Sequence, residues 1–162
     1  MSTYFQKIPS PVGELYAVAS GKSLCALVFK SNWDSFKERF DGLVEKDVPI
    51  LRRTRKQLSE YFQGKRRKFE IPYVLQGTTF QQRVWRSLST IPFGETRSYK
   101  EQAVIVKSPK AARAIGRADG LNPICIILPC HRVLGSDGSL TGFAGGLGVK
   151  RFLLKLEDSK FI

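Results

Sequence analysis

Cys130 and His131 are adjacent in the segment Ile127–Val133, and His131 is the only histidine of the 162-residue chain. A thiolate is a strong nucleophile, and an imidazole is a base that can activate it near neutral pH. The pair therefore indicates covalent chemistry, with Cys130 as the nucleophile. A cysteine after an apolar run is, however, more often a small buried packing residue. The elements around the pair must decide between these two interpretations.

The apolar run Ile124–Leu128 predicts a buried strand that Pro129 ends, which places Cys130 at the end of that strand. Neighbouring residues of a strand point in opposite directions. His131 therefore cannot lie directly against Cys130 without a turn, and a water between the two side chains fits this geometry.

A carboxylate near the end of the chain is the expected partner of the histidine. The spacing of apolar residues predicts a helix from Val149 to about Asp158, and Glu157 lies at the edge of its apolar face. The buried side of this helix is predicted to consist of Val149, Phe152, Leu153 and Leu156. A carboxylate there needs a buried partner, and His131 is the only imidazole that can serve.

Two short helices with a tight connection precede the Cys130 segment. Ser98 is predicted to cap a helix from Tyr99 to about Val106, and Pro109 opens a second from Lys110 to about Asp119. This arrangement is typical of a helix-turn-helix. The second helix combines small residues, which are Ala111, Ala112, Ala114, Gly116 and Ala118, with the basic residues Lys110, Arg113 and Arg117. Tight packing on a neighbouring helix would explain the alanines, whereas binding in a DNA groove also explains the charges.

A glycine-rich segment, residues 142–148, follows the Cys130 segment. It lacks the Gly-Lys-Ser/Thr ending of a phosphate-binding P-loop. Its glycines nevertheless let the backbone come close to a ligand.

The N-terminal half is predicted to contain an antiparallel meander followed by helices. Short apolar runs separated by turn residues indicate strands at residues 4–8, 13–19 and 24–29. Helices are predicted at residues 32–40, capped by Asn32, at 50–62, and at 80–88, capped by Thr78 or Thr79, with an extended edge segment at 69–75. We therefore expect an α+β fold with an N-terminal lobe, residues 1–77, and a C-terminal lobe, residues 78–162, that is mostly helical.

The composition limits the class of protein. A hydrophobic fraction of 42% excludes disorder. No run reaches the roughly 20 apolar residues of a membrane span, and the N-terminus lacks a signal peptide. We expect a protein of the cytoplasm, or of the nucleus where the cell has one. Three cysteines and one histidine, without a Cys-x-x-Cys pair, indicate free thiols and predict neither a metal site nor a cofactor.

The charge of the chain is strongly positive. The formal net charge is +13, and both halves carry an excess of basic residues, 14 against 8 in residues 1–77 and 13 against 6 in residues 78–162. A compact domain with this balance attracts polyanions, of which nucleic acid is the commonest, although high solubility alone also fits.

Taken together, these residues resemble the O6-alkylguanine-DNA alkyltransferases over roughly Thr79 to Glu157. The number of matching blocks in one order makes the resemblance specific. The blocks are Phe80-Gln-Gln-Arg-Val-Trp85, Ile91-Pro-Phe-Gly94, Ser98-Tyr99, Pro109-Lys-Ala-Ala-Arg-Ala114, Asn122-Pro123, Pro129-Cys-His-Arg-Val133 and Gly142-Phe-Ala-Gly-Gly146.

The resemblance implies a repair protein that each reaction consumes. The helix-turn-helix enters the minor groove of duplex DNA, the O6-alkylguanine is flipped out, and Cys130 takes the alkyl group permanently. His131 acts on Cys130 through a water, Glu157 orients His131, and Asn122 holds the turn beneath the site. The resemblance further implies a protein that acts as a monomer without cofactor or membrane.

The resemblance also implies which residues contact the substrate. Tyr99 donates to the flipped base or to its phosphate, the carbonyls of Cys130 and Val133 accept from the guanine amino group, and the N–H of Ala144 points at O6. Phe143 forms a pocket wall, and Arg113 fills the gap in the base stack. The residues expected at the DNA are Arg113, Ala112, Lys110, Arg117 and Lys107.

Three residues depart from the family pattern. Phe143 stands where many members carry tyrosine, and Lys107 occupies a turn position where glycine is usual. Asp119 lies near the end of the second helix, where a neutral residue is commoner, and an acid that faced DNA would be unfavourable.

Three other functions fit part of the sequence. A lesion-binding relative that transfers nothing would lack the acceptor cysteine. A helix-turn-helix regulator would leave Cys130, His131 and Glu157 unexplained. A cysteine hydrolase would need an oxyanion hole and would not need the basic helix.

Overall fold

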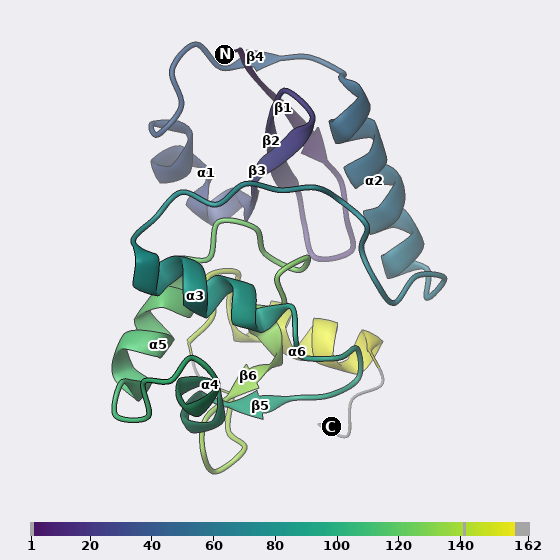
Figure 1. The fold of residues 1–162 in the computed structure, drawn as a ribbon. Coiled ribbons are helices and arrows are strands. Elements are labelled where there is room, and N and C mark those ends of the chain that lie inside the picture. Colours follow the sequence, from purple (N-terminus) through teal and green to yellow (C-terminus); the bar gives the residue numbers. More distant parts are fainter. Residues whose placement is uncertain (1, 141, 158–162) are drawn as a thin grey trace. The chain divides into compact units, whose positions relative to one another are not determined.

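Figure 1 shows the computed structural model, which describes residues 2–140 and 142–157. The chain divides into two compact units, one formed by residues 1–75 with 123–125 and the other by residues 76–122 with 126–162. The sequence predicted a boundary after residue 77. It did not predict that three residues of the later segment belong with the first unit.

The first unit is built on a four-stranded sheet in the order β3-β2-β1-β4. Its strands are β1 (Thr3–Ile8), β2 (Leu15–Ser20), β3 (Ser23–Phe29) and β4 (Val44–Glu45). The first three form the predicted antiparallel meander, and residues 15–19 of the central β2 are all buried. β4 pairs with β1 in parallel and was not predicted, because two exposed residues carry no periodicity.

Two helices cover this sheet, α1 (Lys30–Lys37) and α2 (Pro49–Phe62), and lie on opposite sides of the strands in Figure 1. Trp33 and Phe36 of α1 pack into an aromatic cluster in which the rings of Trp33 and Tyr16 stack with centroids 4.6 Å apart. The predicted cap at Asn32 is wrong. The chain enters α1 directly from β3, so Phe29 is the N-cap and Asn32 lies in the first turn.

The free edge of β3 is extended by two segments that are distant in sequence. Pro72 accepts a hydrogen bond from the amide of Leu24, as the predicted edge position of this proline allows. Ile124 bridges to Leu27, which explains why residues 123–125 belong to the first unit. The predicted strand Ile124–Leu128 is otherwise wrong, because the chain turns at once and Ile126 has a φ of 71°.

The second unit is largely helical. Its elements are α3 (Thr79–Leu88), β5 (Arg97–Ser98), α4 (Tyr99–Ile105), α5 (Ala112–Gly120), the 3₁₀ turn η1 (Cys130–Arg132), β6 (Val133–Leu134) and α6 (Leu147–Leu156). Thr78 and Ser98 cap α3 and α4 through capping boxes with Gln81 and Glu101. α5 begins two residues later than predicted, so Lys110 precedes the helix.

The buried face of α6 differs from the predicted one. Lys150, Leu153, Leu154 and Glu157 are buried and follow one helical face at i, i+3, i+4 and i+7, whereas Phe152 is 39% exposed. The sequence predicted Glu157 at the edge of this face but not Lys150, because only apolar residues were used to define its buried side. The α+β class, with a sheet-containing first unit and a helical second unit, is confirmed. Within residues 2–140 and 142–157, no helix has the length and apolar character needed to cross a membrane.

Candidate active site around Cys130

Cys130 opens a tight 3₁₀ turn instead of ending a strand. The amide of Arg132 donates to the carbonyl of Pro129 at 3.0 Å, and that of Val133 donates to the carbonyl of Cys130. In a 3₁₀ turn successive side chains are about 120° apart. Cys130 and His131 therefore do not point in opposite directions, as the sequence had predicted for a strand. Both are buried, with 5% and 0% of their surfaces exposed.

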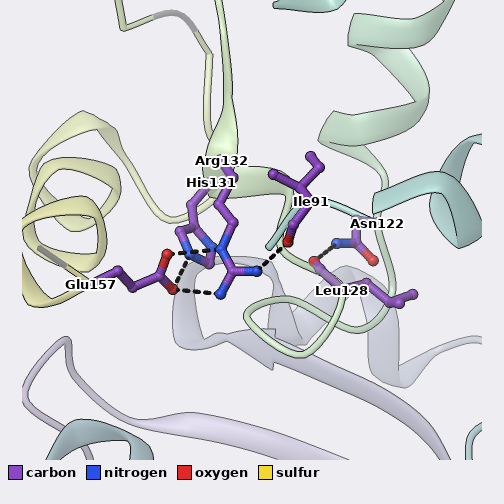
Figure 2. A network of polar contacts seen from close by, with 6 residues as sticks. All are labelled: Ile91, Asn122, Leu128, His131, Arg132 and Glu157. Atoms are coloured by element: carbon purple, nitrogen blue, oxygen red, sulfur yellow. Dashed lines mark hydrogen bonds and ion pairs between the residues drawn. The ribbon is translucent and has the colours of Figure 1, made fainter. Parts of the chain in front are cut away.

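Asn122 supports the backbone just before this turn. Its side-chain amide donates to the carbonyl of Leu128 at 2.8 Å, and only 3% of Asn122 is exposed (Figure 2). An amide that is buried and hydrogen-bonded to the backbone holds a loop in one geometry. The contact joins Asn122 to the backbone two residues before Cys130, and its role beneath the site stays a prediction.

Glu157 lies at the centre of a buried polar network (Figure 2). Its Oε2 is 2.7 Å from Nε2 of His131, as the sequence predicted. Its two oxygens also accept hydrogen bonds from Nε and Nη2 of Arg132, at 2.8 and 3.0 Å. Nη1 of Arg132 donates to the carbonyl of Ile91 at 2.6 Å, so the guanidinium fixes the carboxylate to a second segment.

Arg132 is the member of this network that the sequence left unassigned. A neutral imidazole cannot balance a buried carboxylate, so a cation had to lie nearby. That requirement, together with the position of Arg132 beside His131, was the signal that could have identified it.

The protonation of the network follows from these contacts. Burial alone would raise the pKa of Glu157, but it is outweighed by His131, through its hydrogen bond and through its charge when the ring is protonated, and by the hydrogen bonds and charge of Arg132, which together lower that pKa to about 2. Burial lowers the pKa of His131 more than Glu157 raises it, so the ring is neutral at pH 7. Because an ionised carboxylate only accepts, Nε2 carries the proton and Nδ1 is the acceptor of the ring. Nδ1 is buried and has no hydrogen-bond partner among the described residues.

Two further charged side chains of this unit are buried. Lys150 is 0% exposed, and its Nζ lies 6.0 Å from the centre of the Tyr99 ring. Asp119 is 5% exposed and accepts a hydrogen bond from Gln102 at 3.1 Å. The unfavourable case of an acid that faces DNA therefore does not arise at Asp119, because this carboxyl, in the last turn of α5, is buried. Lys150 was missed because only apolar residues were used to define the face of α6.

A cavity of about 560 Å³ lies where α5 meets the glycine-rich segment. Its lining comes from α4, α5 and the two loops that follow Cys130, and consists of Tyr99, Ala112, Arg113, Gly116, Gly120, Gly135, Ser136, Gly142, Phe143 and Ala144. The structure thus brings together five of the predicted substrate and DNA residues. They are Tyr99, Ala112, Arg113, Phe143 and Ala144.

The other predicted residues lie elsewhere. Val133 is fully buried in β6 and pairs with Arg97 of β5, and neither Val133 nor Cys130 is among the described residues that line the cavity. Lys107, Lys110 and Arg117 are exposed on and around α5, as Arg113 is. Lys107 has a φ of 61°, so the turn before α5 keeps the left-handed conformation that glycine would adopt more easily.

Comparisons with known proteins cover both units. The model of the 6-O-methylguanine DNA methyltransferase DNA-binding domain matches residues 79–159. The model of the ribonuclease-like domain of the same methyltransferases matches residues 3–75.

Individual relatives are similar over nearly their whole length. A methylated-DNA–protein-cysteine methyltransferase of Methanosarcina barkeri is 45% identical over 96% of this chain and 98% of its own. A constitutive methylated-DNA–protein-cysteine methyltransferase of Bacillus subtilis is 41% identical over 95% of this chain and 94% of its own. The crystal structure of Mycobacterium tuberculosis O6-methylguanine methyltransferase matches with a TM-score of 0.87 at 42% identity, over 96% and 93% of the two chains. A Mycobacterium tuberculosis structure in complex with DNA matches with a TM-score of 0.85 at 43% identity, over 96% and 92%.

Proposed function

Because the chain belongs to the 6-O-methylguanine DNA methyltransferase family, we propose that Cys130 is the residue to which it transfers the methyl group. The activity is DNA repair, in which methylated DNA gives its methyl group to a cysteine of the protein itself. The observation that carries the assignment to Cys130 is the buried network behind it. A neutral His131 follows Cys130 directly in a tight turn and is held by Glu157, which in turn accepts hydrogen bonds from Arg132.

The network supplies the base that the thiol needs. A free thiol has a pKa near 8.5 and is only a few per cent ionised at neutral pH, so attack requires that its proton be removed. Nδ1 of His131 takes this proton through a bridging water. Glu157 fixes the tautomer, and Arg132 balances the charge of Glu157, which keeps His131 neutral and ready to accept.

The transfer is a single displacement. The thiolate of Cys130 forms a bond to the alkyl carbon, and the bond from that carbon to O6 breaks. Its electron pair goes to the guanine, which takes up a proton. The product is a thioether, so each protein molecule reacts once.

The cavity of about 560 Å³ supports entry of a flipped base. A guanine stacked in a duplex cannot reach a buried thiol, and extruding it costs a few kcal/mol. Tyr99, Phe143 and Ala144 line the cavity and hold the O6-alkylguanine. The family resemblance directs the N–H of Ala144 at O6. It also assigns the guanine amino group to the carbonyls of Cys130 and Val133, which lie outside the lining of the cavity. Arg113, at the same cavity, fills the place of the base in the stack.

The exposed basic residues of α5 and its approach form the DNA surface. Lys107, Lys110 and Arg117 contact phosphates, while Ala112 and Arg113 enter the minor groove. Two findings support this role: a Mycobacterium tuberculosis relative was solved in complex with DNA, and residues 79–159 match a DNA-binding domain. The protein binds DNA as a monomer. It acts in the compartment that holds the genome, which is the cytoplasm, or the nucleus in a cell that has one.

A stoichiometric titration tests this proposal. Increasing protein is added to a fixed amount of duplex that contains O6-methylguanine, and the remaining lesion is measured. We expect the lesion to disappear at one protein per lesion, and Cys130→Ser to remove none. Cys25→Ser and Cys125→Ser are matched controls, because both cysteines belong to the first unit, and they should behave as the parent. Repeated turnover, or activity retained by Cys130→Ser, would disprove the proposal. Tight binding without loss of the lesion would identify a lesion-binding protein instead.

A further inference from the structure

A groove of about 720 Å³, here named the α2 groove, lies in the first unit. Its lining includes one face of α2, on which Arg52, Arg55 and Lys56 follow one another at i, i+3 and i+4. All three side chains belong to exposed residues. The lining also includes Pro9 and Pro11, from the turn that joins β1 to β2. The methyl transfer proposed above uses none of these residues.

The positive charge of residues 1–77 is concentrated on α2 and the segments that flank it. Residues 47–68 contain eight basic and two acidic residues, which is a net charge of +6. The rest of residues 1–77 contains six basic and six acidic residues and is therefore neutral. Solubility depends on net charge and does not require that the charge gather on one helix, so this concentration indicates an anionic partner.

The two acidic residues of this region do not cancel the charge of the groove. Asp47 lies 3.2 Å from Arg52 and 4.0 Å from Arg55, so a single carboxylate faces two guanidinium groups. These side chains are about half exposed, and ion pairs so open to water are weak enough for another anion to replace the carboxylate. Glu60 accepts a hydrogen bond from Arg66 at 3.0 Å and is balanced by that residue.

The arrangement of the cations fits a polymer better than a single anion. Arg52 and Lys56 are about 6 Å apart along the axis of α2, and the groove face continues through Ser59 to Gln63, about 16 Å from Arg52. One phosphate cannot contact a row of this length. Duplex DNA carries one negative charge per about 1.7 Å of its axis, and basic, hydroxyl and amide side chains all bind its phosphate oxygens.

We propose that the α2 groove binds the phosphate backbone of DNA and is a second DNA surface in addition to that of α5. Its contacts are to the backbone, so it binds damaged and undamaged DNA alike. Electrostatic contacts of this kind supply essentially all of non-specific binding, and the groove therefore helps to hold the protein on DNA before a lesion is met. The inference goes beyond the proposed function, which places DNA on the second unit, and does not depend on the role of Cys130.

The salt dependence of binding tests this proposal. The affinity of the full chain for an undamaged duplex is measured by fluorescence anisotropy at increasing salt concentration. The groove variant carries Arg52→Gln, Arg55→Gln and Lys56→Gln. We expect its slope of log affinity against log salt to be smaller than that of the parent by about 2 to 3, because each phosphate contact contributes about 0.9.

A control variant loses the same charge from the same unit but outside the groove. It carries Lys22→Gln, Lys30→Gln and Arg53→Gln, at exposed positions that do not line the groove. Its slope should remain close to that of the parent. A further variant, Arg52→Lys with Arg55→Lys, keeps the charge and should also keep the slope, which separates loss of charge from damage to the fold.

A footprint on the parent protein provides an independent measurement that needs no substitution. Lysines are acetylated briefly with and without the undamaged duplex, and the modified positions are identified by peptide mass. The duplex should reduce acetylation of Lys56 but not of Lys22 or Lys30. Equal slopes in the groove and control variants would overturn the proposal. Protection of Lys56 by polyglutamate, without protection by the duplex, would also overturn it and would assign the groove to an acidic protein segment.

Discussion

Arg132 determines which form of His131 the folded protein holds. Without a cation, the ionised Glu157 would draw a proton onto the imidazole, and the ring could no longer act as the base proposed for Cys130. The guanidinium binds both oxygens of Glu157 and itself lowers the pKa of His131. The same side chain therefore balances a buried charge and preserves a base.

Replacement of Arg132 by methionine should raise the pKa of His131. The chain has one histidine, so its ring signals in an NMR titration need no assignment. In the parent, burial keeps the ring neutral as the pH falls through 6.5, and the stability that this neutral form provides is lost below that pH. We expect the ring in Arg132→Met to titrate at higher pH, and the variant to lose about 3 kcal/mol of stability because the buried Glu157 loses its guanidinium partner. A ring that titrates in Arg132→Met as it does in the parent would contradict this role.

At the level of elements, the helices were predicted better than the turns between them. Capping residues such as Thr78 and Ser98 act through neighbours three residues away, so their effect is readable from sequence. The turn at Cys130 was predicted as the end of a strand, because a short apolar run does not reveal whether the chain stays extended. Burial of Lys150 and Asp119 depends on partners from other elements, and no local pattern could predict it.

Arg113 and Arg117 of α5 should differ in what they contribute to repair. Arg113 lines the cavity and Arg117 does not, although both are exposed. We expect Arg113→Ala to slow repair in duplex DNA by about tenfold, which corresponds to a part of the free-energy cost of flipping the base. Transfer from a free O6-alkylated guanine base, which needs no flipping, should change little. Arg117→Ala should weaken duplex binding without this selective loss.

Arg53→Ala, which removes an exposed charge from α2 in the first unit, serves as the control for net charge. If Arg113→Ala loses as much transfer activity on the free base as on duplex DNA, Arg113 has no role in flipping.

At the level of the whole molecule, the sequence predicted the α+β class and the order of the main elements. The meander of β1, β2 and β3 was readable because turn residues separate apolar runs. Two other pairings, of β4 with β1 and of Ile124 with the edge of β3, could not be predicted, because they join distant parts of the chain. The cavity likewise required the fold, since Tyr99 and Ala144 meet there from segments far apart in sequence.

The net charge of +13 predicts a binding reaction that depends on salt. Each phosphate that a lysine or arginine neutralises releases a counterion, so the logarithm of affinity should fall linearly with the logarithm of salt concentration. Replacement of Lys107, Lys110 or Arg117 by alanine, one at a time, should reduce the slope of log affinity against log salt by about 0.9 in each variant. The affinity is measured by fluorescence anisotropy on an undamaged duplex. A slope that stays unchanged in all three variants would place the DNA surface elsewhere.

The central claim is that Cys130 accepts the alkyl group, and peptide mass spectrometry tests it most directly. The protein reacts with duplex DNA in which the methyl group of O6-methylguanine carries an isotope label, and its peptides are then mapped. We predict one labelled methyl group per chain, on the peptide that contains Cys130, with Cys25 and Cys125 unlabelled. Label on another residue, or restored guanine without label on the protein, would contradict the account.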